Sequence, residues 1–105
     1  LNMEEKNLKE SQISRGLRVL ETLFLDPING LSNKEIIEKT KLSAVEVCRK
    51  LKQLEEVKWA EKNDLGRWTP SVKPVGLLKK YNLYLSATAE KIESFEHRTN
   101  AYARR

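Results

Sequence analysis

The fold is decided by residues 31–54, which read LSNKEIIEKTKLSAVEVCRKLKQL. The stretch holds two Ser-x-x-Glu patterns, Ser32 with Glu35 and Ser43 with Glu46, and each stands where an amphipathic run begins. This spacing is typical of a capping box, in which the serine accepts from a backbone amide of the first helical turn and the glutamate reaches back. Two short helices joined by so tight a turn predict a helix-turn-helix motif.

The helix that begins after Ser43 is predicted to have two different faces. Wound at 100° per residue, Val47, Leu51 and Leu54 fall on one side, which we expect in the core. The opposite side holds a small apolar group, two cations and an amide, a mixture suited to base edges in the major groove. The predicted DNA-contacting residues on this helix and its cap are Ser43, Ala44, Val45, Glu46, Arg49, Lys52 and Gln53.

The formal charge of this helix is close to zero. Three glutamates offset three cations along it, and this balance argues against strong DNA binding by a single copy. The negative residues are Glu46, Glu55 and Glu56, and the positive residues are Arg49, Lys50 and Lys52.

A further helix is predicted before the motif. Ser14 is its expected cap, and its apolar positions are Leu17, Leu20, Leu23 and Phe24. The residues Asp26-Pro27-Ile28-Asn29-Gly30 end this helix, because proline lacks an amide hydrogen and glycine accepts positive φ.

A β-hairpin is predicted after the motif. Two aromatic, alternating flanks enclose the turn residues Asn63-Asp64-Leu65-Gly66, which predicts a loop of about four residues. Since an isolated hairpin is marginally stable, we expect Trp59 and Trp68 to anchor it onto the helices. Lys62 and Arg67 would flank the tip and complete the predicted DNA-binding set. A hairpin in this position is a wing.

Residues 73–105 predict a long C-terminal helix with a heptad-like apolar stripe, whose spacing is typical of a coiled-coil seam between two copies. Folding of the helix back onto its own domain is the alternative. The predicted dimerisation residues are Leu78, Tyr81, Leu85, Thr88, Ile92, Phe95, Thr99 and Tyr102.

Composition limits the class of protein. The chain has 105 residues and a formal net charge of +5, so it has room for one compact domain with an extension, and it favours a polyanionic partner. Its single cysteine, Cys48, is expected at the edge of the buried face, and its single histidine, His97, has no companion at ligand spacing. No nucleotide-binding loop or catalytic constellation is present, so we expect no enzyme activity, metal or cofactor. A polar start and the absence of a long apolar run favour a cytoplasmic protein without membrane contact.

Three stretches resemble the DNA-binding part of IclR-type transcriptional regulators. Residues 14–23 resemble their opening helix, residues 31–43 their second helix and turn, and residues 47–56 their recognition helix, so that the resemblance covers about residues 13–76. The resemblance implies a winged helix-turn-helix that binds DNA. Two departures stand out. Val57-Lys58-Trp59 replaces the usual glycine before the wing, and the large effector-binding domain of the family is not expected in this chain.

The sequence therefore predicts a mainly α fold with a small β-hairpin. Its parts are a flexible start (1–12), a winged helix-turn-helix domain (13–72) and a long dimerisation helix (73–105). The predicted function is double-stranded DNA binding by a homodimer that regulates transcription. The alternatives are a protein-interaction adaptor built on the same scaffold and, more weakly supported, an RNA-binding module.

Overall fold

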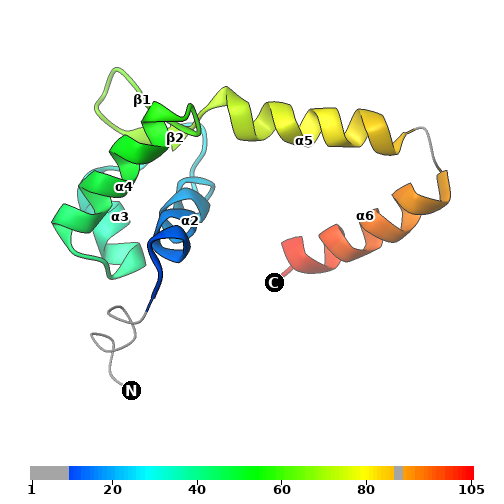
Figure 1. Cartoon of the computed structure of the whole chain (residues 1–105), viewed down its shortest axis with the longest axis horizontal. Helices are drawn as coiled ribbons and strands as arrows, with labels where there is room; N and C mark the ends of the chain where they lie inside the picture. Colours follow the sequence, from blue (N-terminus) through cyan, green and yellow to red (C-terminus); the bar gives the residue numbers. More distant parts are fainter. Residues whose placement is uncertain (1–9, 87–88) are drawn as a thin grey trace. The chain divides into compact units, whose positions relative to one another are not determined.

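The computed structural model describes residues 10–86 and 89–105, with the backbone alone at residues 89, 90 and 92. The chain divides into two compact units, Leu1–Lys73 and Pro74–Arg105. Among the described residues, the first unit holds three helices and a small sheet, and the second holds most of α5 and all of α6 (Figure 1). The predicted class, mainly helical with a two-stranded hairpin, is confirmed.

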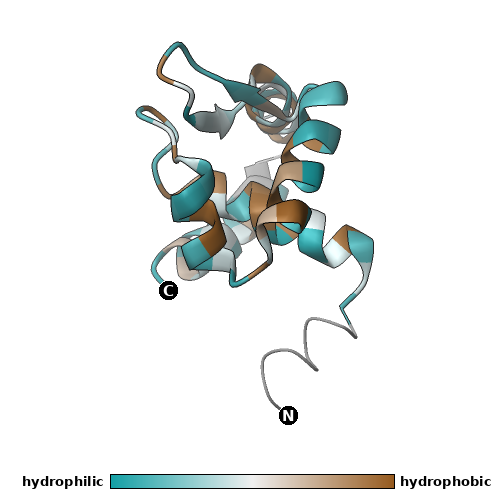
Figure 2. Ribbon diagram, turned by 90° about the vertical axis from the view of Figure 1, so that its left-hand side faces the viewer, coloured by the Kyte–Doolittle hydropathy of each residue, from teal (hydrophilic) through white to brown (hydrophobic). Residues whose placement is uncertain are grey.

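The three helices of the first unit are α2 (Gln12–Leu23), α3 (Asn33–Thr40) and α4 (Ala44–Glu56). All three pack against one another, and their apolar and polar segments alternate along the ribbon in Figure 2. The buried residues at their centre include Val19, Leu23, Ile36, Val47 and Leu51. The helical periodicity of the sequence identifies Leu20, Leu23, Val47 and Leu51 correctly as core residues. It is wrong at Leu17 and Phe24, which are exposed, and it missed the buried Val19.

Serines begin all three helices. Ser32 forms a complete capping box, since its hydroxyl accepts from the amide of Glu35 at 3.1 Å and Glu35 Oε1 accepts from the amide of Ser32 at 3.2 Å. Ser43 caps α4 by accepting from the amide of Glu46 at 3.1 Å. At α2 the prediction was wrong by three residues, because Ser11 and not Ser14 is the cap. The hydroxyl of Ser11 accepts from the amide of Ser14, which lies in the first helical turn.

The wing consists of β1 (Ala60–Lys62) and β2 (Trp68–Pro70), paired antiparallel with Lys62 opposite Trp68. Leu31 pairs with Trp68 as an isolated antiparallel β-bridge. The amide of Leu31 donates to the carbonyl of Trp68 at 2.9 Å, and the amide of Trp68 donates to the carbonyl of Leu31 at 2.8 Å. Trp68 is buried and Trp59 packs against the core, which confirms that the tryptophans anchor the wing. The bridge at Leu31 was not predicted, because a single residue gives no alternating pattern.

The second unit contains two helices in place of the single long helix that the sequence predicts. They are α5 (Val72–Leu85) and α6 (Ala89–Ala103). α5 ends where the Ser86 hydroxyl donates to the carbonyl of Leu83 at 2.7 Å, a local bond that competes with helix propagation. Within this unit the rings of Tyr81 and Phe95 meet edge to face, with centroids 5.1 Å apart.

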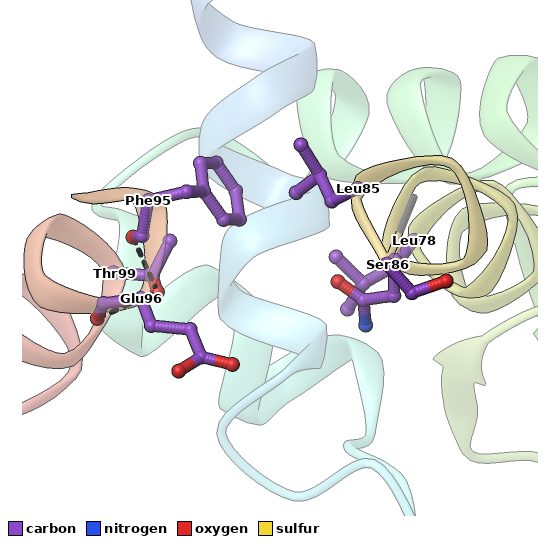
Figure 3. Close-up of a pocket in the computed structure, with 7 residues that line it drawn as sticks. Leu78, Leu85, Ser86, Phe95, Glu96 and Thr99 are labelled. Atoms are coloured by element: carbon purple, nitrogen blue, oxygen red, sulfur yellow. Dashed lines mark hydrogen bonds between the residues drawn. The ribbon is translucent and has the colours of Figure 1, made fainter. Parts of the chain in front are cut away.

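A cavity of about 540 Å³ lies between these two helices. Figure 3 shows Leu85 and Phe95 at its two sides, each carried by a different helix. Leu85 is buried, whereas most apolar side chains of α5 are exposed.

Candidate nucleic-acid interface

The outward face of α4 is the candidate interface. Val45 is 63% exposed, the side chain of Arg49 is 55% exposed, and Lys52 is exposed as well. Together with Ala44 and Cys48 they line one shallow hollow on the surface of the helix. Gln53 and the capping Ser43 are also exposed. The helix thus presents an apolar group and two cations together.

Glu46 is placed differently from the other predicted contact residues. Its Oε2 lies 3.5 Å from Arg15 Nη1 and 3.6 Å from Lys50 Nζ, and its Oε1 lies 3.2 Å from Arg49 Nη1. Only 19% of its side chain is exposed. Glu46 therefore ties α4 to α2 and holds the Arg49 guanidinium in position.

This cluster changes the charge count of the recognition helix. Lys50 is 3% exposed, and its Nζ also donates to Gln12 Oε1, so its charge is satisfied inside the unit. Of the acidic residues on the helix, Glu56 lies in its last turn, about 16 Å along the axis from Val45. The exposed face between Val45 and Lys52 is consequently cationic, because Arg49 and Lys52 lie on it and the exposed carboxylates Glu55 and Glu56 follow in the last turn. Formal charge counting along the helix did not reveal this.

Cys48 is exposed, which corrects its predicted place at the edge of the buried face. Its sulfur accepts from Asn33 Nδ2 at 3.3 Å. The carbonyl oxygen of the same Asn33 side chain accepts from Trp68 Nε1 at 3.0 Å. Asn33 thereby joins α3 to both the recognition helix and the wing.

Arg67 fixes the wing to α3. Its Nη2 donates to Glu35 Oε1 at 2.7 Å and its Nε to the carbonyl of Gly30 at 3.0 Å. The pKa of Glu35 lies below its ordinary value. The main cause is the hydrogen bond that its carboxylate accepts from the backbone of Ser32, followed by the one from the Ser32 hydroxyl, and the nearby charge of Arg67 adds to them. Arg67, one of the two cations predicted to flank the wing tip, is therefore engaged in holding the wing to α3.

Lys62 remains exposed at the base of the tip, with its Nζ 5.8 Å from the centre of the Trp68 ring. The tip itself is organised by Asn63, which sequence reasoning treated only as a turn residue. Asn63 Oδ1 accepts from the amides of Leu65 and Arg67, both at 3.0 Å. The signal available in the sequence was an asparagine three residues before a glycine.

The predicted dimerisation residues lie in the second unit. Leu78, Tyr81 and Tyr102 are exposed there, whereas Phe95 is half-buried against Tyr81. Thr88 lies outside the described residues, as does the side chain of Ile92.

The described residues hold neither a membrane-spanning helix nor a cluster of metal ligands. None of their helices combines the length and the apolar composition needed to cross a bilayer. Within the same ranges, no three histidine, cysteine or carboxylate side chains gather as metal ligands would.

Comparison with known proteins finds similarity to a solved structure. No family model matches the chain, and no curated protein matches it. Among solved structures, the crystal structure of an IclR family transcriptional regulator from Brucella abortus matches 81% of the chain with a TM-score of 0.56 and 27% sequence identity. The matched part is 31% of that regulator, so the chain corresponds to about a third of its length. The resemblance that the sequence indicated is thus confirmed: in fold and in sequence the chain is similar to part of an IclR family transcriptional regulator.

Proposed function

We propose that the chain binds double-stranded DNA as a dimer and regulates transcription. α4 enters the major groove and the wing lies against the adjacent backbone, as in winged helix-turn-helix proteins generally. The observation that carries the proposal is the exposed face of α4, where Val45 lies with the cations Arg49 and Lys52 around one shallow hollow. The similarity to a transcriptional regulator supports the same reading.

The chemistry of this face suits base reading. The Arg49 guanidinium can donate two parallel hydrogen bonds to a guanine or clamp a phosphate, and Val45 can meet a thymine methyl group. Glu46 restrains Arg49, so less side-chain freedom is lost when the guanidinium meets DNA. Glu46 therefore acts through Arg49 and not by contacting a base.

Dimerisation is the second part of the proposal. α5 carries a broad stripe of exposed apolar side chains, which is typical of a helix covered by other protein. In the single chain Leu77, Leu78 and Tyr84 of this helix are exposed. A second copy packed along α5 and α6 would cover them and would join two recognition helices.

Binding to a pool of random 30-base-pair duplexes tests the DNA-binding part. We expect a mobility shift at micromolar protein in about 50 mM salt and a steep loss of affinity towards about 200 mM, because phosphate contacts release counterions. The double variant Arg49→Ala, Lys52→Ala should lose the shift.

The matched control is Lys79→Ala, Lys80→Ala, which removes the same charge from exposed lysines of α5. This variant should retain most of the binding. Absence of any shift by the unaltered protein at low salt would overturn the proposal and favour a protein-interaction adaptor.

A further inference from the structure

Asn33 is the first residue of α3, and both ends of its side-chain amide are bonded to other elements. Its Nδ2 donates to the sulfur of Cys48 at 3.3 Å, and its Oδ1 accepts from Nε1 of Trp68 at 3.0 Å. Cys48 lies within α4, and Trp68 is the first residue of β2. One half-buried side chain of α3 therefore connects the recognition helix to the wing.

Each end of this connection leads to a residue of the proposed DNA-binding surface. At α4, Cys48 lines the same shallow hollow as Val45 and Arg49. At the wing, the Nζ of Lys62 lies 5.8 Å from the centre of the Trp68 ring. A contiguous row of side chains thus runs from the hollow on α4 to the exposed cation of the wing, with the amide from α3 in the middle.

Two further contacts that seat the wing reach other parts of the helices. Arg67 Nη2 donates to Glu35 of α3 at 2.7 Å. The amide of Trp59, just before β1, donates to the carbonyl of Leu54 in the last turn of α4 at 2.8 Å. Neither contact reaches the turns of α4 that line the hollow, whereas the bond to Cys48 does.

We propose that Asn33 is a positioning residue for DNA recognition, which holds the hollow on α4 at a fixed distance from the cation of the wing. This inference rests on the proposed DNA-binding function. In a rigid frame, the contact that Arg49 makes with a base restricts the position of Lys62 over the phosphates, so the second contact costs less entropy. The two contacts then strengthen each other. Where the bond between α3 and α4 is cut, each contact acts by itself.

A double-mutant cycle tests this coupling, on a duplex that the unaltered protein selects from the random 30-base-pair pool in about 50 mM salt. We expect Lys62→Ala to weaken binding by about threefold more in the otherwise unaltered protein than in the Arg49→Ala background. The measured quantity is the dissociation constant of each of the four proteins in the cycle.

The same cycle is then repeated with the connection cut. Cys48→Ala removes the sulfur acceptor and leaves the bond to Trp68 in place, and in this background the losses from Arg49→Ala and Lys62→Ala should simply multiply. Cys48→Ser supplies a hydroxyl oxygen that can accept from the amide, so it should restore the coupling. Asn33→Ala should abolish the coupling and also lower the melting temperature, because the buried indole N–H loses its acceptor.

A purely structural role of Asn33 predicts a different result. Cys48→Ala would then lower the melting temperature and leave the coupling between Arg49 and Lys62 unchanged, and the positioning role would be wrong. Multiplying losses in the unaltered protein would overturn it as well. In both cases the unaltered protein still binds duplexes, and the proposed function stands. If the unaltered protein binds no duplex at low salt, the proposed function itself fails.

Discussion

Gly30 carries two separate constraints at a single residue. Its φ of 84° belongs to the left-handed region, which side-chain-bearing residues adopt at a cost. A Cβ at this position would lie 3.0 Å from both the carbonyl oxygen of Trp68 and the Cβ of Arg67. Glycine is thus what allows the chain before Leu31 to approach β2 and to form the bridge that seats the wing.

Replacement of this glycine tests both constraints. Gly30→Ala should destabilise the folded state by about 2–3 kcal/mol, from the unfavourable φ together with the overpacking against β2. Urea unfolding followed by circular dichroism measures the change in free energy. Gly16→Ala is the control, because its Cβ would meet only Lys50 Cδ, at 3.9 Å, and helix propensity predicts a gain of about 0.5–1 kcal/mol. Equal losses in the two variants would refute this account of Gly30.

Lys58 occupies the position where the sequence departs from the IclR-type pattern. The expected glycine is missing, yet Lys58 has φ 68°. The backbone therefore keeps the conformation that a glycine would favour, and the lysine adopts it at a cost.

We expect Lys58→Gly to stabilise the protein by about 0.5–1 kcal/mol. Glycine removes the cost of the left-handed conformation, and this gain exceeds the stabilisation of the unfolded chain by the added conformational entropy of glycine. Lys58→Ala keeps the unfavourable φ and should bring no such gain. Thermal melts of the two variants side by side decide the matter, and a loss of stability in Lys58→Gly would contradict it.

At the scale of elements, the wing is held to α3 by charge as well as by packing. The lowered pKa of Glu35 means that its carboxylate is stabilised in the folded state. This contribution is fully present above the unfolded pKa, near 4.5, and is lost as the pH falls through the lower folded value.

The melting temperature should therefore fall more steeply below about pH 4.5 in the unaltered protein than in Glu35→Gln. Glutamine keeps the shape of the side chain and can still accept from the Ser32 amide, but it does not titrate. Melting curves between pH 7 and pH 3 provide the comparison. Identical pH profiles would show that Glu35 contributes no pH-dependent stability.

Prediction from sequence succeeded where the determinants are local. The capping box at Ser32, the buried side of α4 and the glycine-containing wing turn all depend on residues close together in the chain. It failed where distant residues decide the outcome. The burial of Lys50 depends on Gln12, and the position of Arg67 on Glu35, 32 residues away. Formal charge along a helix cannot reveal which cations have been used internally.

At the scale of the whole molecule, the proposed function links the charge of α4 to the assembly of the chain. One copy offers only a few cations, chiefly Arg49 and Lys52, to the groove. Two linked copies bind paired half-sites with an effective concentration that raises affinity without any new contact. Affinity for DNA should therefore depend on the helices of the second unit, far along the chain from α4.

The double variant Leu78→Asp, Tyr102→Asp tests this link, because it places a charge on the stripe in each of the two C-terminal helices. Sedimentation equilibrium should give the mass of two chains for the unaltered protein and of one for the variant, since burying unpaired carboxylates in an interface is costly. Leu83→Asp is the matched control: Leu83 is also exposed but lies on the opposite side of α5 from Leu78, so this variant should remain dimeric.

The variant that dissociates should also bind duplex DNA about a hundredfold more weakly or worse, whereas Leu83→Asp should bind normally. A single-chain mass for the unaltered protein would refute dimerisation. Dissociation by Leu83→Asp alone would move the interface to the other side of α5. A monomeric variant with undiminished affinity would break the link itself, because each winged domain would then hold DNA without help from a second copy.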